Sequence, residues 1–234
     1  MISIITVNLN ELEGLKKISN SIIEHDNIEW IVIDGGSSDG SKEYIESNKQ
    51  ISKYLIEKDD GIYDGMNKGR NIFTQNYAIF LNSGDELINI DRLLDILKDD
   101  KSDLLFFDSK KKYKYIEYYR KAKNIDFVEY GMPAIHQSIV YSKKTLKENA
   151  FDMSYTISAD YAHIASIYKQ NPVTRKINIP ISIFKSGGIS TLKSNVVYEE
   201  CQRVQREILE IPEHLIMFFN LRRSLSHFFN KILN

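Results

Sequence analysis

Cysteine and proline are scarce in this sequence, which has one cysteine and four prolines among 234 residues. The single cysteine, Cys201, excludes an internal disulfide framework and is typical of a protein in a reducing compartment. No stretch of about 18 apolar residues could cross a bilayer, and no basic segment followed by an apolar one marks a signal peptide. We therefore expect a cytoplasmic protein.

An excess of charge of one sign is also lacking. The chain has 31 Lys and Arg residues and 32 Asp and Glu residues, for a formal net charge of -1 at pH 7. No global field would attract nucleic acid, so we expect no nucleic-acid partner. The hydrophobic share of 42% and the charged share of 27% are ordinary for a soluble globular protein with a sizeable core.

Common nucleotide-binding loops are missing as well. Residues 35–42 have the composition of a phosphate loop but not its Gly-Lys-Ser/Thr order. No Gly-x-Gly-x-x-Gly follows the first predicted strand, which argues against a dinucleotide-dependent dehydrogenase. A sugar nucleotidyltransferase needs a basic, Gly-rich loop at the same place, where residues 8–11 are acidic instead.

Strands and helices alternate through the first hundred residues. Residues 77–81 form a continuous apolar run bounded by turn residues, as in a strand that is covered on both faces. Strands are predicted at 2–7, 30–34, 53–57 and 77–81, and helices at 12–22, 41–48 and 62–73. Such βαβ units predict an α/β fold with a mostly parallel central sheet flanked by helices.

The second half of the chain is less regular. We predict a short helix at 91–97, strands at 103–108 and 136–141, a helical turn at 143–148, a helix after 157–160, an extended stretch at 173–185, a flexible loop at 186–190 and a helix at 196–209. Residues 110–119 are rich in Lys and Tyr and suggest an exposed hairpin or edge strand, because lysines discourage pairing with other chains.

Polar residues follow each of the first four predicted strands. These ends carry Asn8, Asp34, the segment 59–61 and the segment 82–85. In open α/β sheets ligands bind beyond the carboxyl ends of the strands. Asp85 would therefore project into a cleft, where Mg²⁺ or Mn²⁺ could use its oxygen. The same residue types also favour ordinary turns, so each motif alone has a structural alternative.

Taken in order, these four motifs resemble the family-2 inverting glycosyltransferases with the GT-A fold, and above all their bacterial polysaccharide (colanic-acid-like) branch. The similarity covers about residues 1–190. It implies one GT-A domain over residues 1–212, with a Rossmann-like sheet, a nucleotide-sugar-binding half of about 1–100 and an irregular acceptor half of about 101–212.

The resemblance also implies roles for individual residues. Asp160 matches the catalytic base, and Asp85 matches the metal ligand. The positions matched to nucleotide-sugar binding are Thr6, Asn8, Asp34, Asp60, Gly61, Asn67, Lys68 and Gly84. His136 and Gln137 match a pair that would contact the donor or the acceptor. Asp34 would accept a hydrogen bond from a uracil imide, which discriminates bases better than shape alone.

The acidic motif departs from the Asp-x-Asp pattern of the family, because residues 82–85 read Asn-Ser-Gly-Asp. Mg²⁺ or Mn²⁺ would then be held by Asp85, the donor diphosphate and water, a ligand set that these ions accept. Asp160 would take the proton of the acceptor hydroxyl, which contributes on the order of 10²–10⁴ in rate. The alternatives are Asp34 as a turn former, Asp160 as a helix N-cap, a solvated Lys68 and a structural His136.

The implied function is transfer of a sugar from a nucleoside-diphosphate sugar, with UDP-sugar as the first expectation. The acceptor would be a hydroxyl of a glycan or a lipid-linked saccharide in bacterial surface polysaccharide synthesis. The alternative function is a non-catalytic nucleotide-sugar-binding or scaffold relative, and the degenerate motif at 82–85 is its main support.

Residues 213–234 combine large apolar side chains with Arg222, Arg223 and Lys231. An amphipathic basic helix of this kind suits the bilayer interface, and it would make the protein peripheral on the inner face of the plasma membrane. The alternatives are that this helix packs on the domain or contacts a second copy of the chain in a homodimer.

Overall fold

The computed structural model describes residues 1–22, 25, 27–113, 116–185 and 194–219. The first half contains β1 (Ile2–Asn8), α1 (Leu12–Ile22), β2 (Ile28–Asp34), α2 (Ser41–Ser47), β3 (Ile51–Ile56), α3 (Ile62–Ile72), β4 (Tyr77–Phe80), β5 (Glu86–Leu87) and α4 (Ile90–Asp99). The second half contains β6 (Leu104–Tyr113), β7 (Ile116–Arg120), the 3₁₀ helices η1 (Ile125–Glu129) and η2 (His136–Ser138), β8 (Ile139–Ser142), α5 (Lys143–Glu148), α6 (Ala159–Tyr168), β9 (Thr174–Lys185) and α8 (Ser194–Glu207). Residues 213–219 are also helical.

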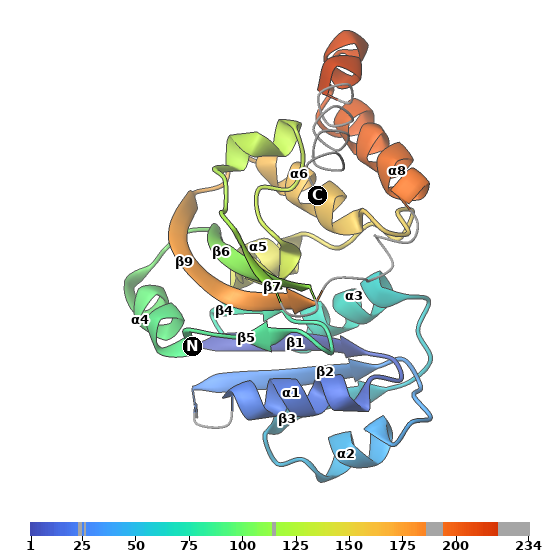
Figure 1. The fold of residues 1–234 in the computed structure, drawn as a ribbon, viewed down its shortest axis with the longest axis vertical. Helices are drawn as coiled ribbons and strands as arrows, with labels where there is room; N and C mark the ends of the chain where they lie inside the picture. The colour runs from blue at the N-terminus through green and yellow to red at the C-terminus, as the bar shows by residue number, and fades with distance from the viewer. Residues whose placement is uncertain (23–24, 26, 114–115, 186–193, 220–234) are drawn as a thin grey trace.

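One sheet runs through the whole domain, in the order β3-β2-β1-β4-β8-β6-β9-β5, with β7 beside β6. Strands β1 to β4 are mutually parallel, which confirms the predicted α/β fold (Figure 1). Strand β8 runs antiparallel to both β4 and β6, and β9 is parallel to β6. Asn8 pairs with Asp34 in the register of β1 and β2, so the polar ends of these two strands lie side by side.

Each face of the sheet has its own hydrophobic core, because side chains alternate along the strands. On β1, Ile5 and Val7 belong to one core, whereas Ile2 and Ile4 belong to the other. The first core is covered by α3, α5, α6 and α8, and the second by α1, α2 and α4. The helices therefore flank both faces, as the alternation of strands and helices predicts.

The structure differs from the predicted strand at 136–141. Residues 136–138 form the 3₁₀ helix η2, and only 139–142 pair as a strand. The backbone N–H of Ser138 donates to Ile135, and its hydroxyl donates to the carbonyl of Asp108 at 3.1 Å. These buried hydrogen bonds satisfy the polar groups of Ser138 within a turn. Strand pairing therefore starts at Ile139.

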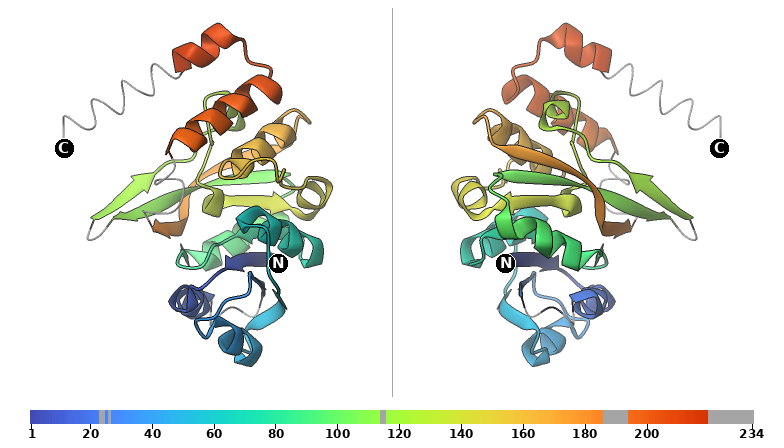
Figure 2. Two further views of the ribbon diagram at one scale, coloured as in Figure 1. Left: turned by 90° about the vertical axis from the view of Figure 1, so that its right-hand side faces the viewer. Right: turned by 90° about the vertical axis from the view of Figure 1, so that its left-hand side faces the viewer.

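The expected hairpin at 110–119 is present, because β6 and β7 pair antiparallel with Lys111 opposite Tyr118. Figure 2 shows this hairpin projecting from the side of the molecule. The loop predicted at 186–190 lies outside the described residues. Among the helices described, none combines the length and the apolar character needed to cross a membrane.

Candidate functional site

The Asp34 carboxylate is enclosed at the end of β2, with 0% of the residue exposed. Its Oδ1 accepts from the backbone N–H groups of Gly36 (3.0 Å) and Ser37 (2.8 Å). Its Oδ2 accepts from the Asn8 amide (2.7 Å) and from the Ser37 hydroxyl (2.6 Å). Both oxygens are thus engaged within the protein. Asp34 thus stabilises the turn that follows β2, which agrees with its alternative role as a turn former.

The neighbouring residues of β1 are equally enclosed. The Asn8 Oδ1 accepts from the Ser83 hydroxyl at 2.7 Å, which joins the ends of β1 and β4. Thr6 is 0% exposed, and its hydroxyl accepts from Trp30 Nε1 at 3.0 Å. These side chains are buried at the carboxyl ends of β1 and β2 and bind one another or their neighbours. The donor contacts of Thr6, Asn8 and Asp34 stay predictions.

The Asp59 carboxylate lies close to Gly35, the residue that follows β2. A Cβ atom at Gly35 would lie 2.8 Å from Asp59 Oδ2, and one at Gly65 would lie 3.5 Å from the same atom. The two glycines therefore leave the space that Asp59 occupies over the end of β2. Its Oδ1 accepts from the N–H of Gly61 at 3.2 Å, and the residue is half-buried. Sequence reasoning placed Asp59 in the segment that lines the donor cleft but did not select it as a contact.

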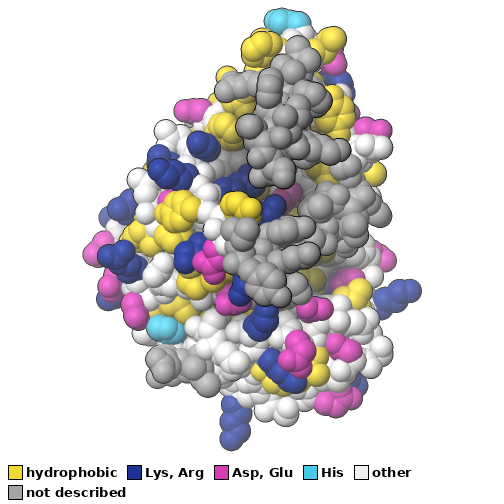
Figure 3. Space-filling view, viewed as in Figure 1, with side chains coloured by type: hydrophobic (Ala, Val, Ile, Leu, Met, Phe, Trp, Pro, Cys, Tyr) yellow, Lys and Arg dark blue, Asp and Glu magenta, His cyan; other side chains and the backbone are white. Residues whose placement is uncertain are grey.

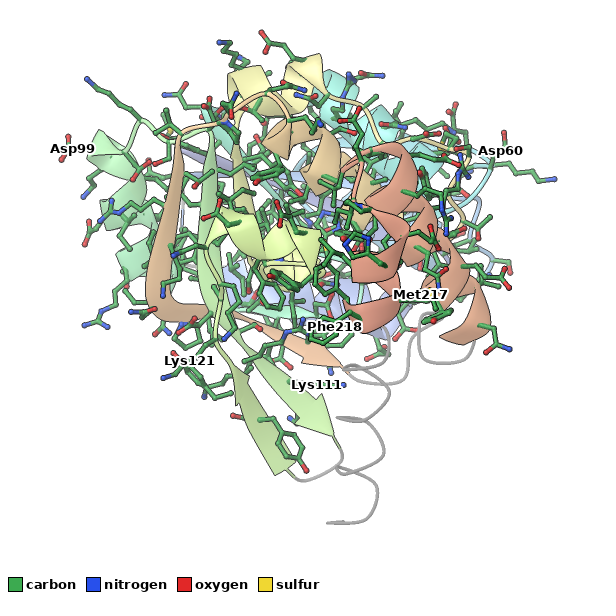
Figure 4. All side chains as sticks on the ribbon, turned by 90° about the horizontal axis from the view of Figure 1, so that it is seen from above. Asp60, Asp99, Lys111, Lys121, Met217 and Phe218 are labelled. Atoms are coloured by element: carbon green, nitrogen blue, oxygen red, sulfur yellow. The ribbon has the colours of Figure 1, made fainter. Side chains whose placement is uncertain are left out.

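The predicted donor residues around α3 occupy different surroundings. Asp60 is exposed at the edge of the molecule, on the side opposite Asp99 (Figure 4). Gly61 precedes α3 with a φ of 110°, a conformation that favours glycine. The Asn67 side-chain amide donates to the carbonyl of Phe151 and accepts from its N–H, at 2.9 Å each. The Asn67 amide is thus committed to joining α3 to residue 151, and its donor contact stays a prediction.

Lys68 lies in a small charged group on the surface. Its ammonium pairs with Glu57 at 2.9 Å and with Asp64 at 3.0 Å. The hydrogen bonds to these two carboxylates raise the pKa of Lys68. This arrangement agrees with the solvated structural alternative, and a donor contact of Lys68 stays a prediction.

The turn at 82–85 carries two side chains with candidate ligand oxygens, Asn82 and Asp85. Gly84 has a φ of 99°, the left-handed conformation that allows the turn. The N–H of Asp85 donates to the carbonyl of Asn82 at 3.0 Å, and Asp85 is 5% exposed. The side-chain oxygen of Asn82 is buried without a hydrogen-bond partner among the described residues.

The oxygen atoms of this turn are of the types that bind divalent cations. Carboxylate and amide oxygens are ligands of Mg²⁺ and of Mn²⁺, and the unsatisfied oxygen of Asn82 is an acceptor that a cation would satisfy. Within the described ranges, no group of three or more His, Cys, Asp or Glu residues gathers at one point. The turn thus offers one carboxylate and one amide oxygen, and Mg²⁺ and Mn²⁺ accept such ligands together with substrate phosphates and water.

Asp160 stands in the first turn of α6. Burial raises the pKa of its carboxyl to about 6, although the N–H of Tyr161 donates to Oδ1 at 2.8 Å and partly offsets this effect. The N-cap of α6 is Ser158, whose side chain makes no capping hydrogen bond. The N-cap alternative for Asp160 is therefore wrong. A carboxylate with a raised pKa at a helix N-terminus is a candidate for proton transfer.

The segment that leads to Asp160 is held by residues that sequence reasoning missed. The Tyr63 hydroxyl of α3 donates to the carbonyl of Ile157. The Glu200 carboxylate of α8 accepts hydrogen bonds from residues 156–158. These contacts join positions far apart in the chain, so no local pattern indicates them.

His136 is enclosed by aromatic rings. Its ring centroid lies 5.2 Å from that of Phe80 and 5.7 Å from that of Phe151. Burial lowers the pKa of His136 to about 3, so the ring is neutral at pH 7. His136 and Gln137 are 8% and 7% exposed. The structural alternative for His136 agrees with this burial, and the substrate contacts of both residues stay predictions.

Only the start of the predicted C-terminal helix is described. Ile216 is fully buried, and the ring of Phe219 lies 4.4 Å from that of Tyr130. Met217 is 67% exposed and Phe218 is 58% exposed (Figure 4). Figure 3 shows hydrophobic side chains gathered at this end of the molecule. Residues 220–234 lie outside the described residues, so membrane contact and a homodimer both stay predictions.

Comparison with known sequences identifies one family. The profile of Glycosyl transferase family 2 matches residues 3–172. An uncharacterized glycosyltransferase of Mycobacterium tuberculosis is 35% identical over 88 residues, which cover 36% of this chain and 34% of that protein. This match spans about a third of the relative's length. A PGL/p-HBAD biosynthesis glycosyltransferase of Mycobacterium tuberculosis is 26% identical over 204 residues, which cover 81% of this chain and 79% of the relative.

Solved structures show the same fold. S. aureus TarS in complex with UDP-GlcNAc superposes with a TM-score of 0.71 at 16% identity, over 88% of this chain and 65% of that chain. Glucosyl-3-phosphoglycerate synthase from Mycobacterium tuberculosis, in complex with Mn²⁺, UDP and glucosyl-3-phosphoglycerate, has a TM-score of 0.63 at 13% identity. That match covers 91% of this chain and 81% of that chain. The GT-A-type fold is thereby confirmed, whereas the colanic-acid-like branch stays a prediction.

Proposed function

The chain belongs to Glycosyl transferase family 2, and from this premise we propose that it is an inverting glycosyltransferase that uses a UDP-sugar. The proposed acceptor is a hydroxyl of a glycan or a lipid-linked saccharide in bacterial surface polysaccharide synthesis. The observation that carries the proposal is Asp160, whose pKa burial raises to about 6. This carboxylate is ionised at neutral pH and is more basic than an ordinary aspartate, as a general base requires.

Donor binding is assigned to the ends of the parallel strands. Asp34 and Asn8 bind each other and fix the turn, so they support the site from below. We assign the contact with the base to Asp59, because its carboxylate lies above the glycine at position 35 and is half-buried. A carboxylate that faces an imide N–H distinguishes uracil from bases without such a donor.

Asp85 and the side-chain oxygen of Asn82 would hold the divalent cation, Mg²⁺ or Mn²⁺. When bound, such an ion stabilises the negative charge of the leaving diphosphate. Mn²⁺ is named in the complexes of glucosyl-3-phosphoglycerate synthase and of a mannosyltransferase from Pyrobaculum calidifontis, and this supports the assignment. The UDP-GlcNAc complex of TarS supports a UDP-sugar donor in the same way.

Asp160 is assigned to the acceptor side of the reaction. The acceptor oxygen forms a bond to the anomeric carbon while the bond from that carbon to the diphosphate oxygen breaks. The hydroxyl proton passes to the Asp160 carboxylate. An alcohol is much less acidic than a carboxyl group, so the proton moves late, as the C–O bond forms. Protonation of Asp160 below about pH 6 would remove the base and slow transfer.

A thermal-shift experiment tests the donor site. The wild-type chain is melted with UDP, GDP, CMP or dTDP, each with and without Mn²⁺. Ligands that bind only the folded state raise its melting temperature. We expect a Mn²⁺-dependent shift with UDP, which Asp85→Asn and Asp59→Ala both reduce. Asp99→Asn is the matched control, because Asp99 is exposed on the opposite side of the molecule (Figure 4).

The non-catalytic alternative predicts a different combination of results. A shift with UDP but no hydrolysis of any UDP-sugar would favour a binding relative, because an intact transferase site hydrolyses its donor slowly in the absence of acceptor. The absence of a shift with every nucleotide would contradict both the donor site and the metal assignment.

A further inference from the structure

The Glu200 carboxylate on α8 receives four hydrogen bonds from the segment that precedes α6. Its Oε1 accepts from the N–H of Thr156 at 2.7 Å and from the Thr156 hydroxyl at 2.8 Å. Its Oε2 accepts from the N–H of Ile157 at 3.0 Å and from that of Ser158 at 2.7 Å. One side chain therefore binds three consecutive backbone N–H groups immediately before the helix that carries Asp160.

One of these groups, the N–H of Ser158, belongs to the N-cap of α6. The first N–H groups of a helix have no acceptor within it and are usually satisfied by an N-cap side chain. Ser158 occupies the N-cap of α6 and makes no such bond. Glu200 supplies an acceptor to the N–H of Ser158 from another helix, and it also binds the two N–H groups that precede the N-cap. A negative charge at this end also suits the helix dipole.

The hydrogen bonds keep Glu200 ionised. Burial alone would raise the pKa of this carboxyl, but the bonds from residues 156–158 lower the pKa below its usual value. Hydrogen bonds to an ionised acceptor are stronger than bonds between neutral groups. The attachment between α8 and residues 156–158 is thus a charged one that persists at the pH of an active enzyme.

Neighbouring residues hold the same segment. On α8, Arg203 donates to the carbonyl (3.2 Å) and the hydroxyl (2.9 Å) of Ser154, and its guanidinium lies 4.2 Å from the Tyr155 ring centroid. On the opposite side, Tyr63 of α3 donates to the carbonyl of Ile157. The segment 154–158 is therefore clamped between α3 and α8.

We propose that Glu200 is a positioning residue for Asp160, and that α8 completes the active site from outside the matched family region, which ends at residue 172. The proposal rests on the assigned role of Asp160 as the base. Glu200 holds the backbone that aims the Asp160 carboxylate at the acceptor hydroxyl. Its negative charge also disfavours ionisation of Asp160 and so keeps that carboxylate basic.

Two variants and a control test this proposal. Glu200→Ala removes all four hydrogen bonds, whereas Glu200→Gln keeps one accepting oxygen and removes the charge. Glu199→Gln changes the exposed neighbour on the same helix and is the matched control. Three quantities are measured for each full-length variant: amide hydrogen exchange at residues 156–158, the kcat and KM values of transfer, and the pH dependence of kcat.

We expect faster exchange at residues 156–158 and a loss of kcat of up to about 100-fold in Glu200→Ala, because small misplacements of a catalytic group are costly. The KM for the donor should not change, since the donor site lies at the ends of β1 to β4. In Glu200→Gln the loss should be smaller, and the acidic limb of the kcat profile should move to lower pH because the neighbouring charge is gone. The control should match wild type.

The exchange measurement separates this proposal from the proposed function, because it needs no reaction. Unchanged exchange at 156–158 in Glu200→Ala would overturn the clamp even in an active enzyme. Faster exchange with kcat within about two-fold of wild type would overturn the positioning role. A wild-type chain that transfers no sugar would contradict the proposed function, while the exchange data would still report on the clamp.

Discussion

The carboxylates of the proposed donor half (residues 1–100) and Asp160 of the proposed acceptor half (101–212) are held in different ways. In the proposed donor half, candidate residues stand at or just after the ends of parallel strands. The pairing of Asn8 with Asp34 is an example, since the sheet register itself brings the two residues together. Asp160 instead follows an irregular segment that side chains of α3 and α8 hold in place.

This difference has consequences for sensitivity to substitution. A strand end is fixed by many backbone hydrogen bonds, so the loss of one side chain leaves its position nearly unchanged. A clamped segment depends on a few side chains, so single substitutions can displace it. Binding residues are often carried by loops on a rigid scaffold, and here the parallel strands are the scaffold while the clamped segment leads into the helix that carries the proposed base.

The substitution Asp160→Asn should have the largest effect, and it should change catalysis without changing donor binding. We expect kcat to fall on the order of 10²–10⁴-fold, because the amide cannot take the acceptor proton. The thermal shift with UDP and Mn²⁺ should remain as in wild type, since the donor half is untouched. Asp126→Asn, at an exposed position of η1, serves as the control and should keep full activity. Near-normal transfer by Asp160→Asn would remove this residue as the base.

The donor half could be predicted closely from the sequence, because its signals are local. An apolar run such as residues 77–81 is bounded by turn residues, and β4 occupies 77–80. The polar residues after each strand were found for the same reason. What remained hidden was the direction of each side chain. Asp34 turns inward to bind Asn8, whereas Asp59 occupies the space above Gly35.

The acceptor half could be predicted only in outline. The helix beginning near Asp160 and the hairpin at 110–119 have local patterns, and both are present. The partners of the clamped segment do not have such patterns, since Tyr63 and Ile157 are 94 positions apart. The pattern of residues 136–141 predicts a strand because its apolar part is extended, whereas buried hydrogen bonds of Ser138 decide the conformation of the turn at His136–Ser138.

Lowering the pH should reduce the free energy of unfolding through Glu29, which lies at the amino end of β2. Its carboxylate accepts from Lys53 at 2.8 Å and from the N–H of Thr74 at 2.9 Å. Burial opposes ionisation, but the hydrogen bonds prevail and lower the pKa of Glu29 to about 2. A lowered folded-state pKa means that this stabilisation is present above the usual value of 4.5 and is lost as the pH falls toward 2.

We therefore expect Glu29→Gln to reduce the free energy of unfolding at pH 7 by about 2 kcal/mol, with allowance for the partly exposed Lys53 partner. The difference from wild type should shrink as the pH falls from 4.5 to 2, measured by urea denaturation at several pH values. Glu13→Gln is the control, because the Glu13 side chain is 79% exposed in its ion pair with Lys16. A difference that does not depend on pH would show that the charge of Glu29 is not the cause.

The smallest effect is expected for Tyr63→Phe, which tests where the two halves meet. The substitution removes the hydrogen bond to Ile157 and the contact of the hydroxyl with the Asp160 carboxylate, which lowers the pKa of that group. It keeps the ring that stacks on Phe151 at 5.9 Å. One hydrogen bond contributes about 1 kcal/mol, so kcat should fall by about five-fold. Glu200 still holds the other side of the segment, which limits the loss. Steady-state kinetics with both substrates would measure it. A raised KM for the donor with unchanged kcat would instead mean that Tyr63 serves the donor half, and that α3 does not position Asp160.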